Sequence, residues 1–255
     1  MEKKSKERFL SFSGVKVQTT AQRIVRQVIA YMSQGKLRPG DKLPPEKLLS
    51  EQFQASRPSV REAIHTLKVI GLVSSRQGDG AYISRINHQA LSNYLLMLRT
   101  IGEFTLSEVS EARLLLEPPI AELATKRATK EDILRLEDVL KETKSRIEAQ
   151  RNPSAKSIRF HRLLGEMCEN PLLSLILNSV LDLLVKEISQ FSSDMKTNKE
   201  ALFMHEKILS AIRKRDSIAA SRNIREDIEK THQNLQRVVK AKVRDKRKRE
   251  GEKDV

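Results

Sequence analysis

A helix followed by a tight hairpin is predicted by the segment SRPSVREAIHTLKVIGLVSSRQGDGAYI, residues 56–83. Ser56 and Ser59 are both capable N-caps, and Pro58 is tolerated only in a first helical turn, so a helix begins here and ends at Gly71. Its apolar positions recur at helical spacing: Val60, Ile64, Leu67 and Ile70. The strand candidates LVSS and AYIS follow, and the glycines between them allow a hairpin turn.

Two further helices are predicted before this segment. TAQRIVRQVIAYMSQG, residues 20–35, repeats apolar residues at helical spacing and ends at a glycine. RPGDKLPP predicts a rigid turn, and EKLLSEQF predicts a short second helix. The N-terminal order is therefore helix, turn, helix, helix and hairpin.

The third helix places Arg57 and Arg61 one turn apart, on the side opposite its apolar residues. A helix pair whose second member projects basic groups fits the major groove of DNA, where an arginine can bind O6 and N7 of guanine. Ser56 and Ser59 would then contact phosphates, and Gln77 would contact the minor groove or the backbone. The alternative is that the two arginines only solvate an exposed face.

Charge is unevenly distributed along the chain. Residues 1–85 carry 16 Lys+Arg against 7 Asp+Glu, a net charge of +9. Residues 86–235 carry 23 Lys+Arg against 22 Asp+Glu and are nearly neutral. A basic domain joined to a neutral one favours a polyanionic partner, with nucleic acid as the leading candidate. The single cysteine, Cys168, excludes an internal disulfide framework, and no apolar stretch approaches the roughly 20 residues of a membrane span. We therefore expect no membrane association and a cytoplasmic location, on the nucleoid when DNA is bound.

The remainder of the chain predicts about seven helices and no strand, so the fold class is mainly α. The expected organisation is a flexible basic arm (1–18), a DNA-binding domain (19–85), an all-helical effector-binding and dimerisation domain (86–240) and a charged disordered tail (241–255).

The first part of the chain resembles a known family. RPGDKLPPEKLLSEQFQASRPSVREAIHTLKVIGLVSSRQGDGAYIS is similar to the winged helix-turn-helix of the GntR family of bacterial transcription regulators, with the resemblance covering residues 20–84. It implies three helices with a β-hairpin wing. The residues it implies to face DNA are Lys47, Ser56, Arg57, Ser59 and Arg61, with Gln77 and Gly78 at the wing. Lys47 replaces a frequent arginine and lacks its planar fork.

Histidines are the informative residues of the helical part. His161 and His205 lie on separate predicted helices beside large apolar residues. A lone histidine in such a setting is more often a core residue than a ligand. Two on separate helices of one bundle weaken that interpretation, because facing helices assemble metal sites in the interior of a bundle.

This part resembles the FCD effector domain of the FadR subfamily over about residues 90–235, through EARLLLEPPIAELA, SIRFHRLLGEMCENPLL and HEKILSAIRKRDSIAASRNIRED. The resemblance implies a divalent metal (zinc, nickel or manganese) at the positions of Ser157, His161, His205 and Asp227. A serine hydroxyl is a poor ligand at neutral pH, which leaves His161, His205 and Asp227 as the predicted set. The alternative is that Ser157 and Asp227, which depart from the family pattern, mark a lost metal site.

Arg113 is the predicted effector-binding residue. An intrahelical salt bridge to Glu117, four residues later, is the simplest interpretation of its position. The resemblance implies instead that Arg113 lines the cavity and pairs with the carboxylate of an organic acid, which the guanidinium fork fits well.

The sequence thus predicts a homodimeric, ligand-responsive DNA-binding regulator and not an enzyme, with a small carboxylate releasing a repressor from a palindromic operator. One alternative is a metal-dependent enzyme on the helical bundle with a DNA-binding appendage. Another is a regulator whose C-terminal domain is structural and binds no ligand.

Overall fold

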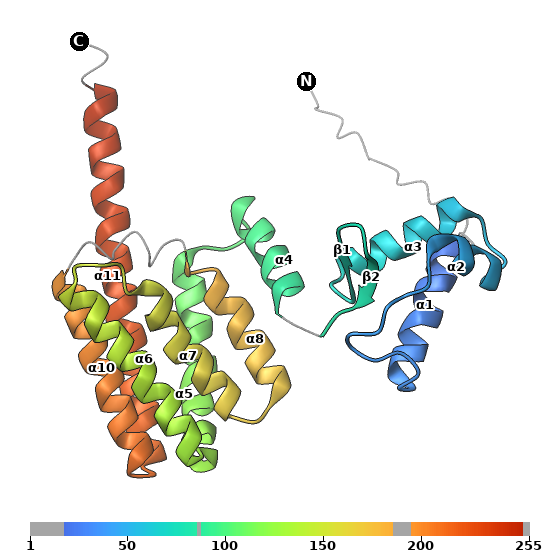
Figure 1. Ribbon diagram of the computed structural model, residues 1–255. Helices are drawn as coiled ribbons and strands as arrows, with labels where there is room; N and C mark the ends of the chain where they lie inside the picture. The colour runs from blue at the N-terminus through green and yellow to red at the C-terminus, as the bar shows by residue number, and fades with distance from the viewer. Residues whose placement is uncertain (1–17, 86–87, 186–194, 252–255) are drawn as a thin grey trace, which may run out of the picture. The chain divides into compact units, whose positions relative to one another are not determined.

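A computed structural model describes residues 18–85, 88–185 and 195–251 (Figure 1). The chain is mainly helical and divides into two compact units, residues 1–87 and 88–255. The first unit contains α1 (Thr20–Ser33), α2 (Glu46–Gln52), α3 (Arg57–Val69), β1 (Val73–Arg76) and β2 (Gly80–Ile83). The described part of the second contains seven helices: α4 (Gln89–Thr100), α5 (Leu106–Arg127), α6 (Lys130–Glu148), α7 (Ser154–Met167), α8 (Pro171–Asp182), α10 (Met195–Arg213) and α11 (Ser217–Gly251). This is the predicted winged helix-turn-helix followed by a helical bundle.

Helix α3 begins directly after its N-cap residue, Ser56. Of the two candidate caps, Ser56 is the one used, because its hydroxyl oxygen accepts the backbone N–H of Ser59 at 3.3 Å. Four apolar residues of α3 are buried in the core of the first unit: Val60, Ala63, Ile64 and Leu67. Ile70, predicted on the same apolar side, lies at the C-cap and is 45% exposed. Burial of this face leaves the opposite, polar face of α3 free for a partner.

The wing is an antiparallel hairpin of β1 and β2. Gly78 has φ of 74° and Gly80 has φ of 123°, values in the left-handed region where a side chain is strained, so these turn positions require glycine. The segment before α2 also joins the hairpin, since the backbone N–H of Leu43 donates to the carbonyl of Ala81 at 2.8 Å. The wing is therefore fixed to the helical part of its unit.

In the second unit, α5 packs against α11, α7 and α8, and α10 packs against α11 and α6. α5 continues through Pro118 and Pro119 without ending. The residues that fill the core come from all six of these helices and include Ile120, Leu136, Phe160, Leu177, Ile208 and Ile224. Within the described residues, no helix has the length and apolarity that crossing a membrane requires.

The C-terminal segment differs from its prediction. α11 continues to Gly251, so residues 241–251 are helical, whereas the sequence predicted a disordered tail from residue 241. The segment is rich in lysine and arginine, which are good helix formers, and it contains no proline. The predicted arm falls outside the described residues except for residue 18, as do residues 252–255 of the tail.

Candidate functional site

The polar face of α3 carries the two predicted base-contacting arginines. Arg57 and Arg61 are both exposed. The guanidinium of Arg61 donates from Nη2 and Nε to the same carboxylate oxygen of Glu46, at 3.0 and 3.2 Å. Because this side chain is 71% exposed, the ion pair contributes little stability, but it orients the guanidinium while leaving other N–H donors available.

The other predicted DNA contacts also lie at the surface of the first unit. Lys47 on α2 and Ser56 before α3 are exposed, and Ser59 is half-buried. The hydroxyl oxygens of Ser56 and Ser59 are 3.0 Å apart, at the end of α3 where backbone N–H groups favour anions. Whether these residues touch DNA stays a prediction; the structure gives their exposure and their mutual contacts.

Gln77 and Gly78 lie exposed in the turn of the wing. Beside them, Asp79 accepts hydrogen bonds from Nζ of Lys42 at 2.7 Å and from the hydroxyl of Tyr82 at 2.5 Å. Arg76 lies over the ring of Tyr82, with its guanidinium carbon 4.3 Å from the ring centroid. This network was not predicted from the sequence, where its available signal was an aspartate between two glycines with Tyr82 close behind.

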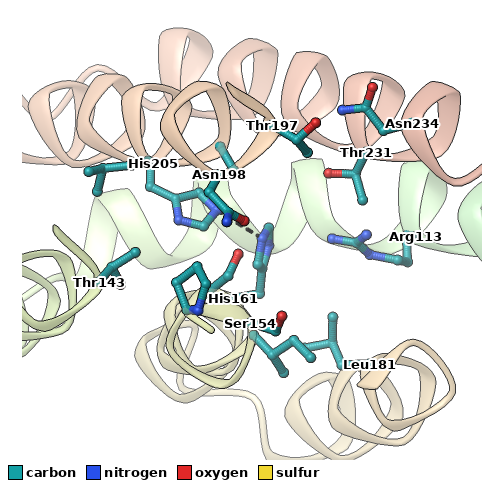
Figure 2. Close-up of a pocket in the computed structure, with 15 residues that line it drawn as sticks. Arg113, Thr143, Ser154, His161, Leu181, Thr197, Asn198, His205, Thr231 and Asn234 are labelled. Carbon is teal, nitrogen blue, oxygen red and sulfur yellow. Dashed lines mark hydrogen bonds between the residues drawn. The ribbon is translucent and has the colours of Figure 1, made fainter. Parts of the chain in front are cut away.

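A small cavity lies inside the second unit (Figure 2). Its volume is about 60 Å³, and three predicted site residues line it: Arg113 on α5, His161 on α7 and His205 on α10. Ser157, one turn before His161, lines it as well. Hydroxyl and amide groups supply much of the remaining wall: Thr143, Ser154, Thr197, Asn198, Thr231 and Asn234. The cavity is thus bordered by both histidines and by several hydroxyl and amide groups, together with apolar side chains such as Ile158 and Leu181.

A buried chain of charged groups runs along one side of this cavity. Arg113 and Glu117 form an ion pair through Nε and Oε1, and both side chains are only 2% exposed. The other carboxylate oxygen of Glu117 lies 2.6 Å from Nδ1 of His161. Arg113 therefore makes the intrahelical salt bridge and lines the cavity at once, so the two interpretations of this residue are compatible.

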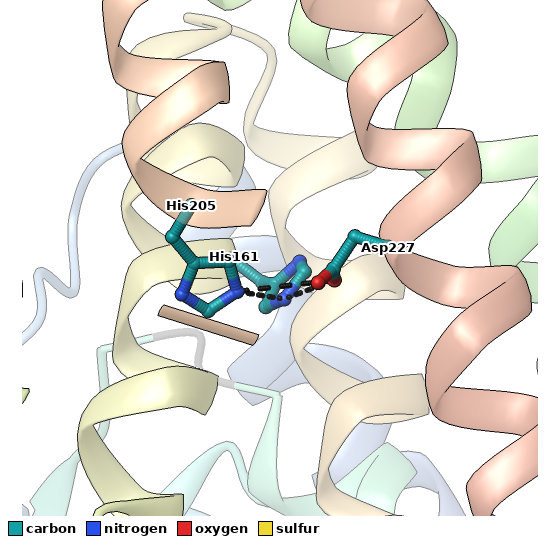
Figure 3. A group of neighbouring side chains, drawn as sticks. All are labelled: His161, His205 and Asp227. Carbon is teal, nitrogen blue, oxygen red and sulfur yellow. Dashed lines mark hydrogen bonds and ion pairs between the residues drawn. The ribbon is translucent and has the colours of Figure 1, made fainter. Parts of the chain in front are cut away.

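His161, His205 and Asp227 meet in the core of the bundle (Figure 3). The Nε2 atoms of the two histidines are 3.2 Å apart, and Oδ2 of Asp227 lies 3.4 Å from Nε2 of His161 and 3.8 Å from Nε2 of His205. All three side chains are buried, and they come from α7, α10 and α11. The stacked ring of Phe160, with centroids 4.3 Å apart, supports His205.

Burial and charged neighbours shift the pKa values of the ionisable side chains in and beside this cluster. Burial raises the pKa of Glu117, but the charges of Arg113 and His161 outweigh it and hold the pKa at about 2. Burial lowers the pKa of His161, but the Glu117 carboxylate and a hydrogen bond to Asp227 raise it to about 9. Burial lowers the pKa of His205 below its ordinary value. Without a metal, His161 is the protonated member of the cluster.

The donor set fits a divalent transition metal. Ligands of a tetrahedral zinc ion at about 2.0–2.1 Å lie about 3.4 Å from one another. The three separations in the cluster, 3.2, 3.4 and 3.8 Å, fall around that value. The bond from Nδ1 of His161 to Glu117 also leaves Nε2 as the ligating nitrogen, the usual arrangement of carboxylate, histidine and metal. From the sequence, Glu117 was expected only as a partner of Arg113, and its contact with His161 was not predicted.

Comparison with known proteins gives consistent matches to both units. Residues 20–83 match the family model for bacterial regulatory proteins of the gntR family, and residues 108–230 match the FCD domain. The HTH-type transcriptional regulator LutR of Bacillus subtilis (strain 168) is 35% identical over 184 residues, covering 70% of this chain and 84% of that protein. The galactonate operon transcriptional repressor of Escherichia coli (strain K12) is 28% identical over 206 residues, covering 78% of this chain and 89% of that protein.

Among solved structures, Streptococcus agalactiae GntR superimposes with a TM-score of 0.62 at 24% identity, covering 84% of this chain and 99% of that one. At 24% identity, this structural similarity shows a shared fold and nothing about function. The sequence relatives are transcriptional regulators and not enzymes, in agreement with the prediction that this chain is not an enzyme. The chain belongs to the GntR family of bacterial regulatory proteins and is a DNA-binding transcriptional regulator with a C-terminal FCD domain.

Proposed function

We propose that this regulator is a homodimeric repressor, and that a small carboxylate bound in the cavity of the second unit releases it from a palindromic operator. Residues 19–85 act as the DNA-binding domain and residues 86–240 as the effector and dimerisation domain. The observation that carries this proposal is the convergence of Arg113, His161 and His205 on one cavity.

Charge balance supports a carboxylate as the ligand. With His161 protonated, its charge and that of Arg113 balance the carboxylates of Glu117 and Asp227. His161, His205 and Asp227 would hold a divalent ion, which supplies a positive charge and open coordination positions to a bound oxygen. When the divalent ion replaces the proton on His161, the ion and Arg113 together exceed the two carboxylates by one positive charge. A ligand with a single carboxylate neutralises this charge.

Arg113 is the residue expected to bind the acid directly. Its Nε is occupied by Glu117, so the two terminal nitrogens remain for a ligand. Two such N–H donors match the two oxygens of a carboxylate. The hydroxyl and amide groups on α6, α7, α10 and α11 that line the rest of the cavity suit a ligand with hydroxyl groups of its own. One relative is named for galactonate, an acid of this kind.

The DNA-binding half of the proposal rests on α3 and the wing. In a two-fold symmetric dimer, the two α3 helices bind two half-sites, so the operator has the same symmetry. The acid acts by binding the two conformations of the dimer unequally. One of the relatives is named a repressor, which favours repression as the direction of control.

Fluorescence anisotropy tests this proposal, using an operator selected from random duplexes with the purified full-length protein. Zinc-loaded protein is titrated with lactate, citrate, galactonate and galacturonate in turn. We expect at least one acid to weaken operator binding about tenfold or more. R113K keeps the charge but loses the fork, so it should retain operator affinity and lose the response, whereas R225K, at an exposed arginine of α11, should match the wild type.

If no acid binds by calorimetry or changes operator affinity, the C-terminal domain is structural and the proposal is wrong. Consumption of an acid by the purified protein would favour the metal-dependent enzyme instead.

A further inference from the structure

Asp182, the last residue of α8, joins three helices of the second unit. One of its carboxylate oxygens pairs with Nη2 of Arg162 on α7. The other accepts the hydroxyl of Ser92 on α4 at 2.6 Å and lies 3.3 Å from Nε2 of His88. The Asp182 side chain is 13% exposed, so these contacts are shielded from solvent and stronger than surface ion pairs.

The neighbours of this network in the chain line the effector cavity. Leu181, next to Asp182, and His161, next to Arg162, are both cavity residues. A ligand that displaces α7 by a fraction of an ångström therefore moves Arg162, and one that displaces α8 moves Asp182 itself.

On its other side, the network holds the first helix of the second unit. α4 begins at Gln89, only six residues after the wing strand β2 ends at Ile83. Besides the contacts with Asp182, α4 donates from Nη1 of Arg99 to the carbonyl of Leu183 at 2.8 Å. The junction of α4 with the C-terminal end of α8 thus combines directional polar contacts with apolar packing of Leu95 and Leu96.

The network also has an unused donor. Nε of Arg162 is buried and has no hydrogen-bond partner among the described residues. Buried donors are almost always satisfied, so an unsatisfied one marks a place where an alternative arrangement can form a bond that this one lacks.

We propose that Asp182 is a positioning residue that couples occupancy of the effector cavity to the placement of α4, and through α4 to the DNA-binding unit. This inference rests on the proposed function, because it requires that a ligand in the cavity alters operator binding. Asp182 does not line the cavity and lies in the second unit, outside the predicted DNA-contacting residues, so its removal should uncouple two binding events while preserving each of them.

The test measures two affinities in one set of proteins. Full-length wild type, D182N and the control D138N, at an exposed aspartate of α6, are loaded with Zn²⁺. Calorimetry measures binding of galactonate, citrate, lactate and galacturonate, and anisotropy measures operator affinity with and without each acid. In D182N, we expect the affinity for operator without acid and the affinity for the acid each to stay within about threefold of the wild type. Addition of the acid should change the operator affinity of D182N less than about threefold. D138N should respond as the wild type does.

A second variant guards against misfolding of D182N. H88A/S92A removes the two α4 side chains that contact Asp182 but leaves its pair with Arg162, and it should show the same loss of coupling. If an acid weakens the operator complexes of D182N and H88A/S92A as much as that of the wild type, Asp182 is not the coupling residue. If the wild type binds no acid or shows no change in operator affinity, the proposed function fails, and this inference fails with it.

Discussion

The carboxylate of Glu117 and Nδ1 of His161 lie 2.6 Å apart, although 44 residues separate them in the chain. This contact fixes which ring nitrogen of His161 faces His205 and Asp227, and it joins the cluster to Arg113 in the cavity wall. Glu117 therefore stands between the two groups expected to bind the effector, without lining the cavity itself.

Substitution of Glu117 by glutamine should weaken Zn²⁺ binding about 10- to 100-fold, the usual effect of losing a carboxylate that orients a ligating histidine. It also leaves the buried guanidinium of Arg113 without its counter-charge, which should destabilise the fold by about 3–5 kcal/mol. Competition with a chromophoric chelator measures the first effect, and urea unfolding measures the second. E111Q, at an exposed position of the same helix, is the control. Unchanged zinc affinity in E117Q would contradict the assigned role.

Zinc should stabilise the wild type by about 2.7 kcal/mol when the free ion is present at a hundred times its Kd, because only the folded chain assembles the three ligands. H205A should lose this stabilisation, as measured by the shift in unfolding midpoint on adding Zn²⁺. The matched control is H232A, since His232 lies on α11 outside the cluster, where its Nε2 contacts Gln236. Equal zinc stabilisation in both variants would place the ion elsewhere.

The sequence predicted the elements of the first unit well, because their signals are local. Ser56, Pro58 and Gly71 mark the ends of α3 regardless of the rest of the chain. The position of Ile70 was harder to predict, since helical periodicity places it on the apolar side while the end of the helix exposes it. The helical tail was missed because predicting disorder from charge ignores the helix propensity of lysine and arginine.

The site was predictable only in part. His161, His205 and Asp227 were found through the resemblance to a known family, and their proximity in the structure agrees with it. The contact of Glu117 with His161 and the network of Asp182 depend on which helices face each other. Helical periodicity identifies the buried face of each helix but does not pair the helices.

Substitution of Arg61 by alanine should weaken operator binding by about 1–3 kcal/mol if the guanidinium contacts a base pair. R61K should recover only part of this, because lysine lacks the two-pronged geometry. R225A, at an exposed arginine of the second unit, should leave operator affinity unchanged in the same anisotropy assay. If R61A binds as the wild type does, the pair of Arg61 with Glu46 is its whole role.

We expect the polar face of α3 to recognise a specific duplex and a ligand in the second unit to control this recognition. The most direct test is the ratio of Kd values of the full-length protein for a scrambled duplex and for its selected operator, at physiological salt, with and without the acids above. We predict a ratio of about 10³ or more without acid and a clear fall with the effector. A ratio near one under both conditions would contradict the account.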